Sequence, residues 1–282
     1  MSIKPTAHAD APPPPWGTYA PRGYRRFLRG LVCLGLARGG LKRWFYRQWT
    51  NSGGNAPADV ITHGLKLRLH PRDNTTESKL LLGSRSRDRE ELEFLITHLP
   101  PGGTFLDVGA NIGFYSLIAA KRRDARVLAI EPLPAAFERL RFNIHANGFE
   151  HRLIPLQAAL GAERKRVTIT FAEGDLGCSS IVKTGIAGRP VEVMMLPLAD
   201  VLAEQGFTRV DAMKIDVEGM EDSVLCPFFK TAPRALWPQA VILEDVHRGD
   251  WKEDLLTQMR EVGYQQLGRT RSNALLHLPA AG

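Results

Sequence analysis

Residues Lys214 to Glu221 read Lys-Ile-Asp-Val-Glu-Gly-Met-Glu, and this octet decides the fold of the chain. The apolar run from Val210 to Ile215 ends there in a group of carboxylates, and Gly219 then turns the chain towards a helix. In an open α/β sheet, strands present such side chains at their carboxyl ends, where ligands bind. The octet therefore predicts a buried parallel strand whose end carries acids that can take part in a reaction.

A second strand end, with a glycine turn, lies upstream at Phe105 to Gly113 (Phe-Leu-Asp-Val-Gly-Ala-Asn-Ile-Gly). Gly109 and Gly113 have the spacing Gly-x-x-x-Gly rather than the Gly-x-Gly-x-x-Gly of dinucleotide-binding folds. Asn111 stands between them, and asparagine tolerates a left-handed backbone better than most residues do. The segment predicts a strand, a tight turn and the start of a helix, with a nucleotide-like cofactor bound at the turn.

Glu131 belongs to the same predicted site, because it ends the next predicted strand, 22 positions after Gly109. A carboxylate at that place accepts hydrogen bonds from both ribose hydroxyls of an adenosine ligand. Pro132 and Leu133 then offer an apolar surface to the adenine. Since no phosphate-neutralising base accompanies the turn, this combination suits S-adenosylmethionine better than a nucleotide.

Acidic side chains gather at two neighbouring predicted strand ends, which would both face the reactive group of the cofactor. The first end contributes Asp216 and Glu218, and the second contributes Glu244, Asp245 and His247. Transfer of the cofactor's methyl group to an alcohol needs a general base, or a divalent cation that acidifies the hydroxyl. We expect Asp216 or His247 to act as the base, and Glu218 and Glu244 to position the substrate.

These residues also have other interpretations. Asp216, Glu244 and Asp245 are hard oxygen ligands that could hold Mg²⁺, and His247 could equally be an ordinary loop histidine. Glu221 and Asp222 fall in the first turn of the predicted helix, where acids interact with the positive end of the helix dipole.

Strands and helices alternate regularly from residue 104 onwards, which predicts a mostly parallel sheet covered by helices on both faces. Two final strand-like segments follow each other without a helix and predict an antiparallel edge at the C-terminal end. A hairpin at 60–69 and a helix at 90–99 precede the alternation. The predicted strands are 104–108, 126–130, 153–158, 166–171, 191–196, 210–215, 240–243, 264–267 and 274–278, and the predicted helices are 113–121, 134–147, 198–205, a helix from 219, and 250–262.

The chain divides into three predicted regions. Residues 1–20 are a Pro-rich tail, expected to be disordered or polyproline-like, residues 21–55 are a basic extension, and residues 56–282 form the main domain. Between Ala11 and Ala58 there is no Asp or Glu. Eight of the 37 Lys and Arg residues lie in that stretch, so the rest of the chain has 29 of them against 30 acids. The basic character of the protein therefore belongs to the extension.

Basic and apolar residues recur in the extension at intervals of three and four, which predicts one or two amphipathic helices interrupted at Gly39-Gly40. One interpretation is that these helices pack on the main domain and expose their arginines to solvent. The other is peripheral membrane contact through residues 21–49, because a basic face with Trp and Phe opposite suits an anionic bilayer surface. Nucleic acid is not expected as a partner, since no recognised binding motif accompanies the charges.

Cys33, Cys178 and Cys226 are widely spaced and odd in number, which indicates neither a disulfide framework nor a metal-binding knuckle. Reduced thiols predict a cytoplasmic location, with peripheral contact at the inner membrane face as the alternative. No segment approaches the roughly 18 apolar residues that span a bilayer.

Between about Val60 and Leu278 the chain resembles the FkbM family of S-adenosylmethionine-dependent methyltransferases. The octet is the most specific matching segment, whereas the glycine turn alone fits many methyltransferases. The matching segments are 105–116, 131–132, 178–180, 196–202, 214–221 and 242–244.

The resemblance implies an α/β, class I methyltransferase fold, Rossmann-like and doubly wound, with a seven-stranded sheet. It also implies O-methylation of a hydroxyl, and we expect the acceptor to be a glycan, a glycolipid or another hydroxylated small molecule. The alternatives are a polyketide-like secondary metabolite, or a non-catalytic binding module that kept the cofactor turn. The residues expected at the cofactor are Asp107, Gly109, Ala110, Asn111, Gly113, Glu131 and Pro132.

Overall fold

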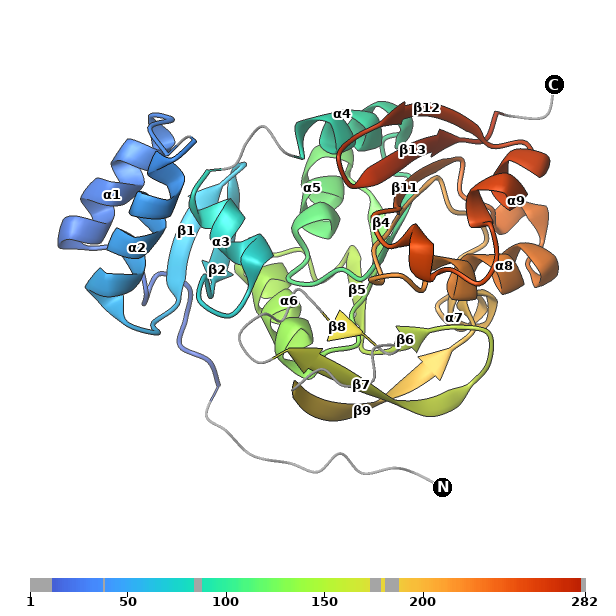
Figure 1. The fold of residues 1–282 in the computed structure, drawn as a ribbon, viewed down its shortest axis with the longest axis horizontal. Coiled ribbons are helices and arrows are strands. Elements are labelled where there is room, and N and C mark those ends of the chain that lie inside the picture. The colour runs from blue at the N-terminus through green and yellow to red at the C-terminus, as the bar shows by residue number, and fades with distance from the viewer. Residues whose placement is uncertain (1–11, 38, 84–87, 173–178, 181–187, 280–282) are drawn as a thin grey trace.

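The computed structural model describes residues 12–37, 39–83, 88–172, 179–180 and 188–279, and its centre is a seven-stranded sheet (Figure 1). The order of its strands is β12 (Gln265–Arg269), β13 (Asn273–His277), β11 (Ala240–Glu244), β10 (Ala212–Ile215), β3 (Thr104–Val108), β4 (Arg126–Ile130) and β5 (Leu153–Leu156). The strands from β11 to β5 pair in parallel. The predicted mostly parallel sheet is confirmed, and at its C-terminal edge β13 runs against its neighbours while β12 lies outermost.

Helices cover both faces of this sheet (Figure 1). The first face carries α4 (Arg89–His98), α5 (Phe114–Arg123) and α6 (Pro134–Asn147), and the second carries α7 (Leu198–Glu204), α8 (Glu221–Thr231) and α9 (Leu255–Glu261). Successive strand residues point to opposite faces, so Phe105 and Ile242 enter the first core while Leu106 and Leu243 enter the second. Burial on both faces explains why the central strands are almost entirely apolar.

An N-terminal hairpin extends the first core. It consists of β1 (Ala58–Thr62) and β2 (Leu65–Leu69), as the sequence predicts. Its two connecting residues, His63 and Gly64, have φ values of 51° and 73°. Positive φ at both central residues gives a turn whose twist matches that of the flanking strands, which fixes the register of the hairpin.

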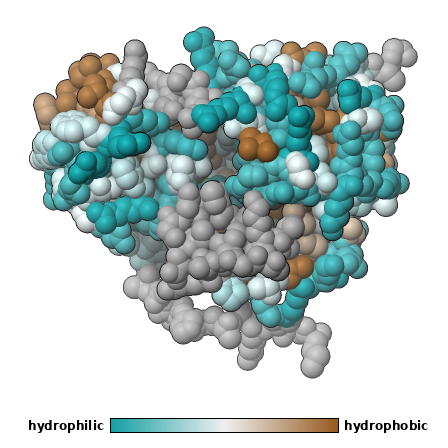
Figure 2. All heavy atoms as spheres, viewed as in Figure 1, coloured by the Kyte–Doolittle hydropathy of each residue, from teal (hydrophilic) through white to brown (hydrophobic). Residues whose placement is uncertain are grey.

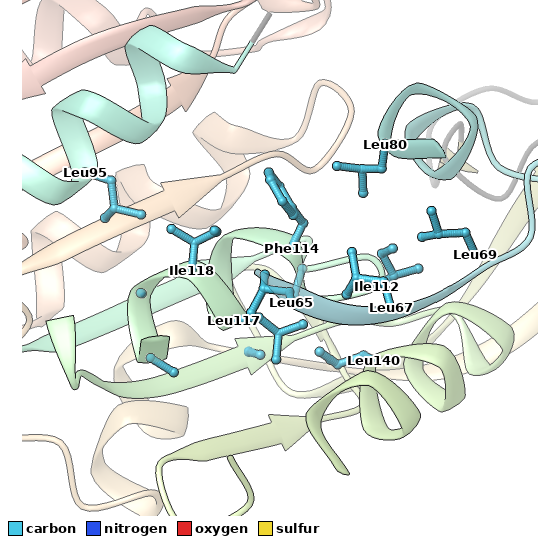
Figure 3. Packing of buried hydrophobic residues seen from close by; sticks show 14 of the residues in the cluster. Leu65, Leu67, Leu69, Leu80, Leu95, Ile112, Phe114, Leu117, Ile118 and Leu140 are labelled. Atoms are coloured by element: carbon cyan, nitrogen blue, oxygen red, sulfur yellow. The ribbon is translucent and has the colours of Figure 1, made fainter. Parts of the chain in front are cut away.

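The apolar side of this hairpin packs against the main domain (Figure 3). Leu65, Leu67 and Leu69 alternate along β2 and are fully buried. They belong to the same cluster as Ile112 at the glycine turn and Leu140 on α6. The helix α3 (Thr75–Leu81) completes this layer and places its N-terminal turn beside the glycine turn, as the contact of Asn74 with Asn111 described below shows.

The basic extension forms two helices, α1 (Gly23–Cys33) and α2 (Leu41–Gly53), separated near Gly39-Gly40 as predicted. Their side chains Leu28, Val32, Phe45 and Trp49 are buried in the first core, so the extension packs on the main domain. The helix α2 ends at Gly53, and Gly54 follows it with a positive φ of 58°.

The Pro-rich segment before α1 is held in place by a buried ion pair. The Arg68 guanidinium group donates to the carbonyl oxygens of Pro14 at 2.8 Å and Pro15 at 2.9 Å, and also to Asp59 at 2.7 Å. Asp59 in turn accepts from the backbone N–H of Gly17 at 2.7 Å. Buried side chains therefore bind backbone groups of the segment 12–20, for which the sequence predicts a disordered or polyproline-like conformation. Residues 1–11 lie outside the described part of the chain.

A second, smaller sheet is inserted between β5 and α7. Its order is β6 (Ala159–Leu160), β9 (Gly188–Leu196), β7 (Lys165–Ala172) and β8 (Ser179–Ser180). The predicted strands 166–171 and 191–196 form its antiparallel centre. Cys178, which the family resemblance includes, lies outside the described residues.

The helix predicted at 250–262 is shorter in the structure. A 3₁₀ turn occupies Arg248–Asp250, and α9 begins only at Leu255. The Asp254 side chain accepts a hydrogen bond from the Thr257 N–H at 3.1 Å and so caps the helix at this later residue. None of the helices formed by the described residues has the length and hydropathy that crossing a bilayer requires.

The buried pair generates a prediction for stability. The side chains of Arg68 and Asp59 are 7% and 0% exposed, so Asp59→Ala leaves a buried charge without its partner. We expect the free energy of unfolding, measured by chemical denaturation, to fall by about 3–5 kcal/mol. The matched control is Glu93→Ala, which removes the carboxylate of the solvent-exposed Arg89–Glu93 pair and should leave stability nearly unchanged. Equal losses in the two variants would contradict the role assigned to the buried pair.

Candidate active site

A cavity of about 640 Å³ opens at the carboxyl ends of β3, β4, β10 and β11. Parallel strands bring their ends to one edge, which is why residues far apart in sequence meet there. Of the residues predicted for the site, Gly113, Asp245 and His247 are not part of the lining. Those that line the cavity are Asp107, Gly109, Ala110, Asn111, Glu131, Pro132, Asp216, Glu218 and Glu244.

The glycine turn is held against the neighbouring strand end. A Cβ atom on Gly109 would lie 1.9 Å from the backbone oxygen of Asp216, and φ at Gly109 is 75°. Asn111 has φ of 52°, which confirms the left-handed conformation predicted for it. The Asn111 side-chain oxygen accepts a hydrogen bond from Asn74 Nδ2 at 2.8 Å. Gly109 is therefore required by the close approach of two backbones, and Asn111 connects the turn to the start of α3.

Asp107 lies below this turn and fixes the start of α5. Its carboxylate accepts hydrogen bonds from the Ser116 N–H at 3.0 Å and the Ser116 hydroxyl at 2.6 Å. Asp107 is 1% exposed, and burial raises the pKa of its carboxyl group, against the opposing effects of Lys214 and Ser116. The part that Asp107 plays in the structure is thus to position the turn and helix that border the cavity.

Glu131 holds the turn from the end of β4. Its two carboxylate oxygens accept from the backbone N–H groups of Asn111 at 2.8 Å and Leu133 at 2.9 Å. Burial raises the pKa of Glu131 to about 7, although these two hydrogen bonds oppose the shift. A carboxylate oxygen can accept more than one hydrogen bond, so Glu131 can still receive donors from a ligand in the cavity.

Lys214, Asp216 and Glu244 form a charged group at the centre of the site. Lys214 Nζ lies 2.8 Å from Asp216 Oδ2. Burial alone would raise the pKa of Asp216, but the Lys214 ammonium group lowers it. Burial and the charge of Asp216 raise the pKa of Glu244 to about 10. At neutral pH Asp216 is therefore ionised and Glu244 is protonated.

Glu218 and His247 form a second pair at the rim. Their side chains approach to 3.2 Å between Nε2 and Oε2, and Glu218 lines the cavity while His247 packs behind it against Gly219. Glu218 has φ of 55°, an uncommon conformation for a residue with a Cβ atom. Backbone strain of this kind is concentrated at functional sites. The geometry thus puts His247 in contact with a cavity residue, not in the cavity itself.

The three candidate magnesium ligands are not brought together. Asp245 is not part of the cavity lining, and its side chain forms an ion pair with Arg269 on β12. Its backbone N–H donates a hydrogen bond to Ser272 O at 3.0 Å. Among the described residues there is no group of three or more His, Cys, Asp or Glu side chains arranged to hold a metal ion. Asp216 and Glu244 remain at the cavity, and Asp245 joins β11 to the C-terminal hairpin.

Glu221 and Asp222 lie in the first turn of α8, as predicted, and they also organise the loops beside the cavity. Glu221 accepts hydrogen bonds from the Val217 N–H at 2.9 Å and the Trp251 indole N–H at 2.8 Å. Asp222 accepts from the Lys252 N–H at 2.7 Å. Both acids are buried and outside the cavity lining, so they support the turn that carries Asp216 and Glu218.

Several residues that line the cavity are not predicted from the sequence. Lys214 belongs to the octet, but the sequence assigns it no role. The other unpredicted cavity residues come from segments without a recognisable motif. Glu91 on α4 is bonded to Asn273 on β13 at 3.1 Å, across 182 residues. Nothing local marks such residues, because their role arises only when α4 and β13 meet at the sheet. The additional polar lining residues are Thr75, Thr76, Lys79, Asp88, Glu91, Tyr115, Lys214, Arg271, Ser272 and Asn273.

The residues present fit S-adenosylmethionine. Glu131 provides carboxylate oxygens for a ribose diol, next to the apolar surface of Pro132. Among the described residues, Glu91 Oε2 and Glu244 Oε2 are buried atoms without a hydrogen-bond partner, and both side chains line the cavity. Orphaned oxygen atoms of this kind are acceptors for hydroxyl or ammonium donors of a bound molecule. Glu131 and Asn111 are candidates to hold the cofactor, and Asp107 positions the turn that carries Asn111.

Several known proteins are similar to this chain. The Methyltransferase FkbM domain matches residues 107–265, which is more than half of the chain. Methyltransferase sdnD of Sordaria araneosa is 30% identical over 160 residues, covering 46% of this chain and 62% of sdnD. The 31-O-demethyl-FK506 methyltransferase FkbM of Streptomyces tacrolimicus is 29% identical over 210 residues, covering 63% of this chain and 77% of that protein.

The match to sdnD thus spans less than two thirds of its length. Among solved structures, a methyltransferase from Pyrococcus furiosus is similar with a TM-score of 0.43 and 18% identity, covering 84% of this chain and 96% of that chain. The M. jannaschii TYW2 structure in complex with AdoMet has a TM-score of 0.41 and 12% identity, covering 80% of this chain and 89% of that chain.

Glu131 generates a prediction for pH dependence. Its pKa of about 7 means that the carboxyl group gains a proton as the pH falls through neutrality. Ribose hydroxyls donate to the ionised form, so the Kd for S-adenosylhomocysteine should rise on acidification, by up to about tenfold per pH unit below the pKa. Titration calorimetry between about pH 8 and about pH 6 measures this change. Glu131→Gln should bind more weakly and without that dependence; an equal pH response in the variant would exclude Glu131 as its source.

Proposed function

The chain belongs to the FkbM methyltransferase family and its cofactor is S-adenosylmethionine, and from this premise we propose that it transfers a methyl group to a hydroxyl of a glycan or glycolipid. The observation that supports this most directly is that Asp216, ion-paired with Lys214, lines the same cavity as the ribose-binding candidate Glu131. One cavity therefore carries a candidate for cofactor binding and a candidate for accepting the proton.

The bound cofactor supplies an electrophilic methyl group, so the protein must orient the acceptor and remove the proton of its hydroxyl. Asp216 takes that proton on its carboxylate. Lys214 keeps this carboxylate ionised and fixed, 2.8 Å from its ammonium group. Between the two bases expected from the sequence, the geometry favours Asp216, because His247 does not line the cavity.

Glu244 and Glu218 are assigned to substrate positioning. Glu244 is protonated at neutral pH, so its O–H group can donate a hydrogen bond to an acceptor oxygen or to Asp216. Glu218, held by His247, accepts hydrogen bonds at the rim. Apolar side chains from the other walls, among them Ile130, Leu160 and Val246, help to exclude water from the reacting groups.

The remaining lining supports a hydroxyl-rich acceptor. The polar side chains Asp88, Glu91, Arg271, Ser272 and Asn273 line the wall formed by α4 and the C-terminal hairpin. Carboxylate, amide, hydroxyl and guanidinium groups on one wall provide both donors and acceptors for several sugar hydroxyls. This distribution favours a glycan or a glycolipid acceptor.

A secondary metabolite is the second candidate, and one relative favours it. The name 31-O-demethyl-FK506 methyltransferase assigns that protein, 29% identical to this chain, a demethylated FK506 substrate. A binding module that kept only the cofactor turn is less well supported, because Asp216, Glu218 and Glu244 all line the cavity. The free thiols of Cys33 and Cys226 support a cytoplasmic location in the proposal.

Asp216→Asn tests the proposed chemistry. The amide keeps the shape of the side chain but cannot accept the hydroxyl proton, so turnover should fall about a hundredfold or more while the Kd for S-adenosylhomocysteine stays near the parent value. The measurements are S-adenosylhomocysteine release with a panel of saccharide and metabolite acceptors, and calorimetry. Asp200→Asn, an exposed acid on α7, is the matched control and should keep full turnover.

Two results would overturn the proposal. Unchanged turnover in Asp216→Asn would remove Asp216 as the base. Methylation of amines alone by the parent enzyme, with no hydroxyl acceptor modified, would contradict O-methylation. Mass spectrometry of the products distinguishes these outcomes.

A further inference from the structure

The extension carries an exposed apolar surface in addition to its buried one. We define the apolar ridge by six side chains that are 45–78% exposed: Tyr24, Phe27, Leu34, Leu36, Leu41 and Trp44. Of the ten large hydrophobic side chains exposed in the described part of the chain, these six fall within 21 consecutive residues. Figure 2 shows a corresponding hydrophobic patch at the upper left, over α1 and α2. Such a concentration marks an interaction surface rather than scattered exposure.

The ridge is formed by the two helices and the segment between them: Tyr24 and Phe27 lie on α1, Leu41 and Trp44 on α2, and Leu34 and Leu36 in the connection. Tyr24, Phe27 and Leu34 are spaced by three and seven residues, which places them along one side of α1 and its end. The Tyr24 and Phe27 rings stack at 6.4 Å between centroids. Tyr24 also reaches α2, where its hydroxyl donates to Gln48 Oε1 at 3.3 Å, one turn beyond Trp44. The two exposed faces therefore join into one surface.

Packing on the main domain does not use this ridge. The residues that enter the first core are Leu28 and Val32 on α1 and Phe45 and Trp49 on α2. Each helix thus has one broad apolar face, of which one edge is buried in the fold and the other edge is exposed. Exposed aromatic and leucine side chains concentrated in this way favour a role in binding another surface.

The charges beside the ridge have a single sign. Arg22, Arg26, Arg43 and Arg47 are exposed, and the sequence from Ala11 to Ala58 contains no acid. Arg43 and Arg47 are one helical turn apart and lie beside Trp44 on α2. Apolar and aromatic side chains flanked by cations match the boundary between acyl chains and anionic headgroups.

We infer that the apolar ridge docks on an anionic lipid bilayer and holds the enzyme at the membrane surface. A second copy of the chain is a poorer occupant, because a symmetric dimer would place the same basic surface against itself, and like charges in an interface are unfavourable. Nucleic acid would be bound by the arginines but would leave the leucines and Trp44 in water. This inference does not depend on the reaction that the cavity catalyses.

The docking surface is rigidly connected to the cavity through β1 and α3. Arg29 on α1 donates to the carbonyl oxygen of Leu81, the last residue of α3, and to that of Ile61 at 3.3 Å. Tyr46 on α2 donates to Pro71 O at 3.1 Å. The other end of α3 contributes Thr75 to the cavity lining. Membrane docking would therefore hold the cavity in a fixed orientation relative to the bilayer.

Vesicle co-sedimentation of the full chain tests this inference. The parent protein should bind vesicles of equal parts phosphatidylcholine and phosphatidylglycerol, and bind phosphatidylcholine vesicles much more weakly. Phe27→Ser combined with Trp44→Ser should lower binding to the anionic vesicles about tenfold or more, since both side chains lose their contact with the acyl region. Leu267→Ser on β12, equally exposed but outside the ridge, is the matched control and should bind like the parent.

A second pair of variants tests the charges. Arg43→Glu combined with Arg47→Glu should reduce binding to the anionic vesicles about tenfold and change binding to neutral vesicles little, and the difference should shrink at high salt. Arg122→Glu, an exposed arginine on α5, is the control. Retained S-adenosylhomocysteine affinity and thermal unfolding temperature show that all variants are folded.

Three outcomes would overturn the inference. Parent binding no stronger than that of Phe27→Ser/Trp44→Ser would show that the ridge does not contact lipid. Equal binding to anionic and neutral vesicles by the parent would exclude the charge contribution. A parent dimer in sedimentation velocity that becomes monomeric in the same double variant, with no vesicle binding, would assign the ridge to a second copy of the chain.

Discussion

The active-site cavity depends on one buried cation, the Lys214 ammonium group. It lies opposite Asp107 in the register of β3 and β10 and 2.8 Å from Asp216 Oδ2. Burial ordinarily lowers the pKa of an amine, but the carboxylates of Asp216 and Asp107 outweigh burial here and raise the pKa of Lys214. This charge lowers the pKa of Asp216, while burial and the charge of Asp216 raise the pKa of Glu244. The lysine thus favours the ionised form of one carboxyl group, and burial favours the protonated form of its neighbour.

A backbone contact also holds two strand ends of the site together. The Asp216 N–H donates to Val108 O at 3.0 Å, and the next residue of that turn, Gly109, has no room for a Cβ atom beside Asp216 O. The turn that Glu131 holds and the strand that carries Asp216 are therefore locked together. Because both are parts of one sheet, the distance between the glycine turn and the acids is fixed before any ligand binds.

The N-terminal extension shows how one segment can serve folding and interaction at once. Its inward residues, such as Phe45 and Trp49, belong to the core that also buries Leu65 on β2. Its outward residues make no such contribution, and they lie beside a row of exposed arginines. The main domain thus holds the outward face in one orientation, which two isolated short helices could not maintain in water.

The sequence by itself determined the alternation of elements and the position of the glycine turn. Strands 104–108 and 126–130 and the helix 134–147 have the predicted bounds, because apolar runs, glycine turns and the proline at 134 are local signals. The class of residues at the strand ends, including Asp216 and Glu131, followed from the same signals. These features depend on neighbours within a few residues along the chain.

Only the tertiary structure decided which of these residues share the cavity and which do not. Asp245 and His247 follow β11 directly, yet the ion pair with Arg269 and the packing on Gly219 keep them out of the lining. Glu91 enters it through a contact with Asn273, 182 residues away. Arg68 binds the carbonyl groups of a proline segment for which composition alone predicts a disordered or polyproline-like conformation. Long-range contacts of this kind are made by side chains whose local sequence has no distinctive pattern, so they are determined by the packing of the sheet and its helices and not by any single segment.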